Sequence, residues 1–403
     1  MLILNQLPDY SSPLDPSDLQ TLGLHAAAEV QRFLAHRKPV GPTPLYSLPG
    51  LAQQLNVGSL FVKDEGQRLG LGSFKALGGS YAVIRLVLER AALELGKPVD
   101  VTDLHSDAVR NVASRMTVAC ATDGNHGRSV AQGAALVGAQ SMIFVHSGVS
   151  EERARAIASF GAEIIRVEGN YDDSVAIATK VSTEKGWEIV SDTSWPGYVR
   201  TPSLVMQGYT AIVSEALAQM AEPPTHVFIQ AGVGGIAAAL AGHLAIRMGK
   251  ARPKLIVVEP DRAACIVQSV VAGQPIKIAH DQPTVMAMLE CYEPSLVAWR
   301  ILSRVADAFM TVDDQEAVSV MKQLARPVHG DPAVVAGESG GAGLAGLIKA
   351  ASHEKFRAQL AIDAHARIFI VNTEGATDPL QYRKLVGMDP EEVPASGSIA
   401  AHA

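Results

Sequence analysis

The chain has 403 residues, of which 48% are hydrophobic and 19% charged, and its formal net charge is −7. This balance supports a large buried core and argues against a disordered chain, and the length favours two or three domains. The sequence has no basic cluster interleaved with aromatic residues and no run near the roughly 18 apolar residues of a membrane helix, and we expect no secretion signal in its first residues. We therefore expect a cytoplasmic protein that binds neither nucleic acid nor membranes.

The N-terminal part predicts a helix and a strand ahead of a glycine-rich segment. Residues 17–37 have helical spacing, with Ser17 as the expected N-cap. The β-branched run at 59–66 predicts a strand. The stretch LGSFKALGGS, residues 71–80, then places one lysine, Lys75, among glycine, serine and small apolar residues at the start of a long helix.

Strands and helices alternate from residue 117 onward, which predicts parallel sheets covered by helices. The expected strands are 117–122, 140–147, 163–169, 187–194, 225–232 and 253–260. Residues 261–350 are expected to be mostly helical, and the last strand is expected at 367–375. The polar tail, 389–403, is expected to fray.

Three cysteines, Cys120, Cys265 and Cys291, make neither a disulfide framework nor a zinc motif. Their spacing leaves open whether Cys265 and Cys291 pair. No cluster of metal-ligating residues stands out along the chain, so no metal is expected.

In open parallel sheets, ligands bind beyond the carboxyl ends of the strands, and three predicted strand ends carry chemistry. The first is QAGVGGIA, where Gly232, Gly234 and Gly235 expose backbone N–H groups at a helix start and favour a phosphate. The same stretch matches the dinucleotide fingerprint, with Glu259 placed to bind a ribose. This loop alone therefore leaves a nicotinamide-dependent oxidoreductase open.

The second strand end is ATDGNHGRSVA. Thr122, Gly124 and Gly127 suit a helix N-terminus that binds a carboxylate through N–H groups, and the Asn125 amide can donate to an oxyanion. Asp123 would repel an anion, so it serves as a general base, as a ligand of a substrate amine, or as an N-cap. His126 taken alone is more typical of a packed residue than of a catalyst.

The third strand end, VNTEGATDP, places the hydroxyl of Thr373 after a buried strand, where it either bonds a ring nitrogen or belongs to a turn. Lys75 presents a similar choice. Most lysines lie on the surface. A buried lysine, however, has a lowered pKa and can attack an aldehyde to form a Schiff base.

Five stretches occur in the order and spacing of the fold-type-II pyridoxal-phosphate enzymes, the superfamily of tryptophan synthase β and the serine/threonine dehydratases. They are SFKALGG, TDGNHGR, QAGVGGIA, VVEP and NTEGATD. Within this superfamily the chain resembles the diaminopropionate ammonia-lyases. The resemblance implies an α/β architecture with two open, mainly parallel twisted sheets and covering helices. It also implies a homodimer, a large cofactor-binding domain formed by 1–76 and 201–403, and a small mobile domain formed by 77–200.

The resemblance further implies a site for pyridoxal 5'-phosphate. Lys75 would hold this cofactor as a Schiff base, Asn125 would bond its ring oxygen, and Thr373 would lie near its ring nitrogen. The implied cofactor-binding residues are Lys75, Phe74, Asn125, Gly232, Val233, Gly234, Gly235 and Thr373. The implied catalytic residues are Lys75, Asp123 and Asp192, and the implied substrate-binding residues are Thr122, Asp123, Gly124, His126 and Asp192.

The implied reaction is an α,β-elimination that degrades 2,3-diaminopropionate to pyruvate and two molecules of ammonia. Asp123 favours this lyase over the related dehydratases, which carry a small residue at the corresponding position. Asp192 would bind the β-ammonium group of the substrate. A serine/threonine-type dehydratase of the same fold and a cofactor-binding regulator without activity stay open as alternatives. The chain departs from the family at Gly72, Ser73, Met288, Glu290 and Tyr292, which leaves the exact substrate and its stereochemistry open.

Overall fold

The computed structural model describes residues 1–37, 41–122, 124–169, 171–279, 282–327 and 330–394. The chain divides into two compact units. The first unit comprises Met1–Leu24, Pro42–Phe74 and Ile212–Ala403, and the second comprises His25–Gly41 and Lys75–Ala211.

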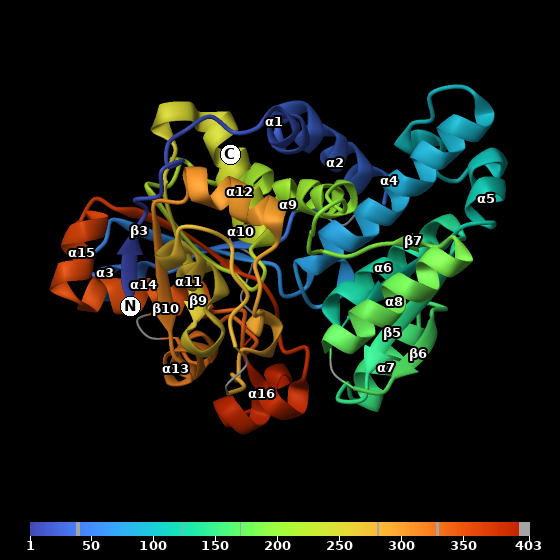
Figure 1. Ribbon diagram of the computed structural model, residues 1–403. Helices are drawn as coiled ribbons and strands as arrows, with labels where there is room; N and C mark the ends of the chain where they lie inside the picture. The colour runs from blue at the N-terminus through green and yellow to red at the C-terminus, as the bar shows by residue number, and fades with distance from the viewer. Residues whose placement is uncertain (38–40, 123, 170, 280–281, 328–329, 395–403) are drawn as a thin grey trace. The chain divides into compact units, whose positions relative to one another are not determined.

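A seven-stranded sheet forms the framework of the first unit (Figure 1). Its order is β1-β10-β9-β8-β11-β3-β2, in which the five central strands are parallel and the edge strands β1 and β2 run antiparallel to their neighbours. The strands are β1 Leu2–Leu4, β2 Leu45–Ser47, β3 Ser59–Asp64, β8 His226–Gln230, β9 Lys254–Pro260, β10 Ala308–Val312 and β11 Arg367–Asn372.

The central strands of this sheet are buried on both faces, which explains their nearly continuous apolar sequences. Every residue of β8 and β10 is buried. Phe228, Val258 and Met310 share one apolar cluster with residues of α14 (Ala342–Ser352). Because successive side chains of a strand point to opposite faces, Val227 and Ile229 face away from that cluster.

Helices surround this sheet. α14 packs on β8, β9 and β10, α10 packs on β8 and along α12, and α3 packs on β3. The other helices of the first unit are α1 Pro16–Leu22, α3 Pro49–Gln54, α10 Gly235–Met248, α11 Cys265–Ala272, α12 Leu296–Val305, α13 Asp314–Ala325, α15 Glu354–Leu360 and α16 Pro379–Val386. α9 Arg200–Gln219 begins in the second unit and ends in the first.

The second unit contains a four-stranded, entirely parallel sheet of order β6-β5-β4-β7. Its strands are β4 Thr117–Ala121, β5 Gln140–His146, β6 Glu163–Val167 and β7 Glu188–Ile189. Its helices are α2 Leu24–His36, α4 Lys75–Leu95, α5 Asp107–Ala113, α6 Asn125–Val137, α7 Glu151–Ala158 and α8 Tyr171–Lys185. α6 and α8 both pack on β4 and β5, so each parallel connection places a helix against the sheet, as the alternating sequence predicts.

Several predicted elements differ from the structure. The N-terminal helix divides at Gly23 into α1 and α2, and its N-cap is Asp15 rather than Ser17, because Pro16 occupies the first helical position. The region 261–350 contains the buried strand β10, whose short apolar run does not distinguish a strand from a buried helix. β1 was not predicted. The predicted strand 187–194 forms regular pairs only at β7.

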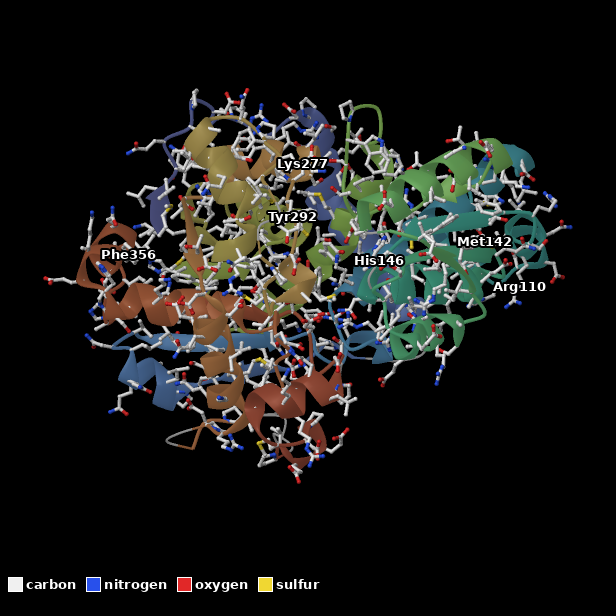
Figure 2. The ribbon with its side chains drawn as sticks, turned by 60° about the horizontal axis from the view of Figure 1, so that its bottom comes forward. Arg110, Met142, His146, Lys277, Tyr292 and Phe356 are labelled. Carbon is white, nitrogen blue, oxygen red and sulfur yellow. The ribbon has the colours of Figure 1, made fainter. Side chains whose placement is uncertain are left out.

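The long connection between α11 and α12 is not one continuous helix. Its described residues include the short 3-10 helix Ala287–Leu289, and the connection folds back on itself, since the Ile278 N–H donates to the Tyr292 carbonyl at 2.8 Å. Figure 2 labels Lys277 and Tyr292 in this connection. Residues 395–403 of the tail lie outside the described residues. None of the helices within the described ranges is long and apolar enough to cross a membrane.

Candidate active site

In the second unit, Lys75 and Asp192 form an ion pair. Lys75 is the first residue of α4, and Asp192 follows β7. The ammonium of Lys75 donates to Oδ2 of Asp192, and the two side chains are only 20% and 14% exposed. Burial alone would raise the pKa of Asp192, but the Lys75 charge and the Lys75 hydrogen bond outweigh it and lower that pKa below its ordinary value. Asp192 is therefore an ionised acceptor for an amine.

The helix that begins at Lys75 packs side by side with the helix that begins at Asn125. A Cβ on Gly79 would lie 2.8 Å from Oγ of Ser129, and a Cβ on Gly133 would lie 2.7 Å from Cα of Ser80. Gly79 and Ser129 are each the fifth residue of their helix. α4 and α6 therefore run in the same direction with their N-terminal ends together, which brings Lys75 and Asn125 to the same end of this helix pair.

The loop before α6 is held by the Thr122 hydroxyl, which accepts hydrogen bonds from the N–H groups of Gly124 and Gly127, each at 3.1 Å. These two N–H groups were expected to bind a carboxylate, but they are already bonded to Thr122. Asn125 is the first helical residue and is buried. Asp123 lies outside the described residues.

His126 is a buried neighbour of the ion pair. Its Nε2 donates to the Val190 carbonyl at 2.7 Å, and burial lowers its pKa, so the ring is neutral with its proton on Nε2. Within the described ranges its Nδ1 has no hydrogen-bond partner. The neutral ring therefore presents an unused acceptor nitrogen.

The glycine-rich stretch of the first unit lies between β8 and α10. Gly234 has φ +97°, and a Cβ there would lie 3.0 Å from Cδ1 of Ile266. A Cβ on Gly232 would lie 2.8 Å from Sγ of Cys291. Side chains are thus excluded where the backbone enters α10 at Gly235, and the helix N-terminus offers N–H groups and a positive dipole end to an anion. This loop fits a phosphate group.

Glu259 is not free to bind a ribose. It is fully buried, and its two carboxylate oxygens accept the N–H groups of Ile266 at 2.8 Å and Val267 at 2.6 Å. Burial raises its pKa to about 8. Glu259 therefore caps the first turn of α11, which removes the carboxylate that a nicotinamide-dependent reading requires. None of the three cysteines, all of which lie within the described ranges, forms a disulfide, so Cys265 and Cys291 are not bonded to each other.

The segment that leads to Lys75 is fixed by the segment after β11. The Phe74 N–H donates to the Thr373 carbonyl at 2.9 Å, and the Gly375 N–H donates to the Gly72 carbonyl at 3.0 Å. Gly72 has φ +80°, a conformation that favours glycine. This backbone conformation accounts for a glycine at a position where the chain differs from the family. Lys75 therefore follows directly on a residue anchored at Thr373.

A buried charge network anchors the beginning of the same loop. Arg68 donates to Glu65 and to Glu215 at 2.6–2.8 Å, and Lys63 pairs with Glu215 at 2.7 Å. All four side chains are at most 8% exposed. We did not predict this network. The charged residues of the run VKDEGQR, in an otherwise apolar strand and loop, were the available signal.

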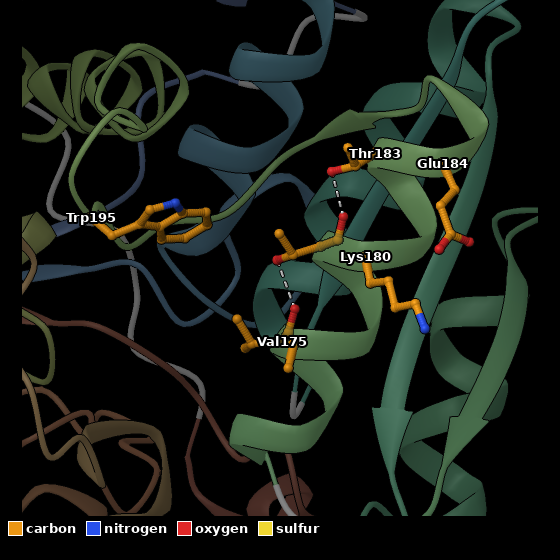
Figure 3. Close-up of a pocket in the computed structure, with 7 residues that line it drawn as sticks. Val175, Lys180, Thr183, Glu184 and Trp195 are labelled. Atoms are coloured by element: carbon orange, nitrogen blue, oxygen red, sulfur yellow. Dashed lines mark hydrogen bonds between the residues drawn. The ribbon is translucent and has the colours of Figure 1, made fainter.

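A groove of about 510 Å³ in the second unit contains none of the predicted site residues. It is lined by α8 and Trp195, whose ring faces the helix in Figure 3 and stacks on Tyr198. We do not assign this open groove to the active site. The predicted residues of the first unit, Phe74, Gly232, Val233, Gly234, Gly235 and Thr373, lie at or next to the carboxyl ends of β8 and β11 instead.

Comparisons with known proteins identify the family of this chain. The family model for pyridoxal-phosphate dependent enzymes matches residues 36–374. The diaminopropionate ammonia-lyase of Escherichia coli K12 is 39% identical over 360 residues, which cover 87% of this chain and 89% of that protein. The protein of the same name from Salmonella typhimurium is 36% identical, over 91% and 93% of the two chains.

The fold also matches a solved structure. The E. coli diaminopropionate ammonia-lyase in complex with an aminoacrylate–PLP azomethine reaction intermediate superposes with a TM-score of 0.85 at 35% identity, over 96% of both chains. This chain is accordingly a carbon–nitrogen lyase that uses pyridoxal 5'-phosphate, and a nicotinamide-dependent oxidoreductase is excluded. The chain belongs to the pyridoxal-phosphate dependent enzymes and, within them, to the family of the diaminopropionate ammonia-lyases.

Proposed function

We propose that this protein converts 2,3-diaminopropionate and water to pyruvate and two molecules of ammonia. The observation that carries the proposal is the ion pair between Lys75, at the start of α4, and Asp192. This pair supplies an amine for the cofactor and, beside it, a carboxylate that binds an amine. The activity of the E. coli and S. typhimurium relatives supports the same substrate.

The cofactor's ring withdraws electrons from the substrate's α-carbon when it is bound. We assign its phosphate to Gly232, Val233, Gly234 and Gly235, because these residues precede an open helix N-terminus. Asn125 would donate to the ring oxygen, and the Thr373 hydroxyl would lie at the ring nitrogen. Phe74 would flank the cofactor through its bond to Thr373.

We assign the proton transfers to Lys75 and Asp123. Nζ of Lys75 would accept the proton on the α-carbon from one face of the substrate. Asp123, from the loop before α6, would accept it from the opposite face, so both enantiomers would react. Either residue would then protonate the departing β-amine.

Asp192 would select for the β-ammonium group. It already accepts a hydrogen bond from one ammonium, that of Lys75, in a mostly buried setting. Serine offers a neutral hydroxyl there, which leaves the carboxylate unpaired and binds more weakly. Thr122 and Gly124, in the loop before α6, and His126, in the first turn of α6, would orient the substrate's carboxylate, with Thr122 acting through its cap on α6.

The proposal includes the setting of the reaction. A small domain of residues 77–200 would move to close over the substrate. The protein would act as a homodimer in the cytoplasm and in amino-acid degradation. These statements rest on the family resemblance.

The proposal is tested by recording the visible absorbance of the purified protein and its pyruvate release with diaminopropionate, serine and threonine. We expect release from diaminopropionate to exceed release from either hydroxy amino acid. Lys75→Ala should abolish the visible band and the turnover, whereas Lys180→Ala, on the exposed side of α8, should keep both. Preferred release from serine or threonine would instead establish the dehydratase alternative.

A further inference from the structure

The side chain of Gln230, the last residue of β8, contacts the hydroxyl of Thr373. Gln230 is fully buried and Thr373 is 3% exposed. Nε2 of Gln230 lies 2.8 Å from Oγ1 of Thr373, and 2.6, 3.2 and 3.1 Å from the carbonyl oxygens of Gly340, Ser339 and Val371. Gln230 ends β8, and Thr373 directly follows the adjacent strand β11 in the first unit.

The direction of this hydrogen bond follows from its neighbours. Three of the four atoms around Nε2 are carbonyl oxygens, which only accept, so the nitrogen and not the oxygen of the amide must face them. Its two hydrogens go to the two shortest contacts, the carbonyl of Gly340 and Oγ1 of Thr373. Oε1 of Gln230, on the other side, is buried and has no partner within the described ranges. The amide therefore keeps this orientation although one of its atoms goes unbonded.

The consequence concerns the proton of the Thr373 hydroxyl. Its oxygen already accepts from Gln230, and among the described residues the hydroxyl donates to none. A hydroxyl whose oxygen already accepts one hydrogen bond, and whose proton has no acceptor among the described residues, can donate that proton to a ligand. An unprotonated ring nitrogen would accept this proton, whereas a protonated nitrogen, bonded to the second lone pair of the oxygen, would leave the hydroxyl proton without an acceptor.

We infer that Gln230 is a positioning residue, which acts through Thr373 to keep the ring nitrogen of the cofactor unprotonated and hydrogen-bonded. This inference rests on the proposed placement of the cofactor ring beside Thr373. It deepens the proposed function, because an unprotonated ring withdraws fewer electrons and suits an elimination, in which the negative charge on the α-carbon is short-lived.

The test uses the holoenzyme loaded with pyridoxal 5'-phosphate carrying ¹⁵N in its ring, and it reads the chemical shift of that nitrogen by NMR. Thr373→Val removes the hydroxyl and defines the shift of an unbonded nitrogen. In Gln230→Met the three carbonyls compete for the hydroxyl proton, so the shift should move most of the way to the Thr373→Val value. Thr373→Ser keeps a hydroxyl and should restore the wild-type shift.

Gln207→Met is the matched control. Gln207 is also buried, and its Nε2 donates to a hydroxyl, that of Tyr81, at 2.7 Å, and to the Ala26 carbonyl. This variant removes a comparable amide and should leave the ring-nitrogen shift unchanged. The dissociation constant of the cofactor should rise roughly 2- to 10-fold in Gln230→Met, the effect of one hydrogen bond, and stay constant in Gln207→Met.

Three results would overturn the inference. They are a wild-type shift in Gln230→Met, an equal change in Gln207→Met, and a protonated ring nitrogen in the unaltered holoenzyme. The last needs no variant, so it applies even if Gln230→Met fails to fold. The expected pattern of shifts supports the inference even where diaminopropionate is not turned over, whereas a chain that binds no cofactor overturns both the inference and the proposed function.

Discussion

Replacing Glu215 by glutamine should destabilise the first unit strongly, because Glu215 balances a buried charge network. The network contains two cations, Lys63 and Arg68, and two carboxylates, Glu65 and Glu215, and is neutral as a whole. Glu215→Gln leaves one positive charge without a counter-charge. Breaking a buried ion pair from one side costs about 3–5 kcal/mol.

The structure places this variant at the lower end of that range. The oxygens of Glu215 accept from Arg68 twice, from Lys63 and from the Thr43 N–H. After the substitution Arg68 keeps its bonds to Glu65, and Lys63 keeps its bonds to the Thr43 carbonyl and Gln219. We therefore expect a loss of about 3 kcal/mol in the free energy of unfolding.

The assay is equilibrium urea unfolding at neutral pH, where this loss should lower the transition midpoint by about 1 M. Glu188→Gln is the matched control, since Glu188 pairs with Arg90 on the surface with both side chains at least 40% exposed, and it should cost under about 1 kcal/mol. The double variant Lys63→Met/Glu215→Gln restores the neutrality of the network, so its loss in the free energy of unfolding should be smaller than the sum of the losses of the two single variants. A Glu215→Gln protein as stable as the Glu188→Gln protein would refute this reasoning.

Three further predictions concern the second unit and α11. In the cofactor-free protein, Asp192→Asn should lower stability at neutral pH, and the difference from wild type should vanish as pH falls through the lowered pKa of that carboxyl; urea midpoints that differ equally at all pH values would contradict this. Gly133→Ala should cost about 1–3 kcal/mol because its Cβ meets the backbone of Ser80, whereas Gly41→Ala, which meets nothing within 4 Å, should be neutral in the same unfolding assay. Glu259 has a raised pKa of about 8, so its contribution to the free energy of unfolding is full below pH 4.5 and is lost as the pH rises through 8. The urea midpoint of the wild type should therefore fall over this range, and Glu259→Gln should flatten the fall. Parallel pH profiles for the two proteins would argue against this assignment.

The parts of the site that follow strand ends could be predicted from the sequence. A glycine-rich turn after an apolar run predicts a helix N-terminus open to an anion, and α10 does begin at Gly235. In the same way, the long helix predicted to begin near Lys75 is present as α4. Such features are local, because a few consecutive residues determine them.

The supporting contacts could not be predicted, because their partners are far apart in the chain. Arg68 and Glu215 are 147 residues apart, and Gln230 and Thr373 are 143 residues apart. β1 has only three residues, and its pairing with β10 decides that it is a strand. Local sequence patterns carry no signal for such pairings. The charged residues near Lys63, for example, are as typical of a solvent-exposed turn as of a buried charge network.

The place of β11 in its sheet constrains how the protein is made. β11 is the last strand in the chain, yet it lies between β8 and β3 and pairs with both. While the ribosome is still extending the chain, β3 and β2 have no neighbour through which to join the other strands. The amine at position 75 thus acquires its final support only when residues 367–375 emerge, so a nascent or prematurely terminated chain cannot assemble a working centre.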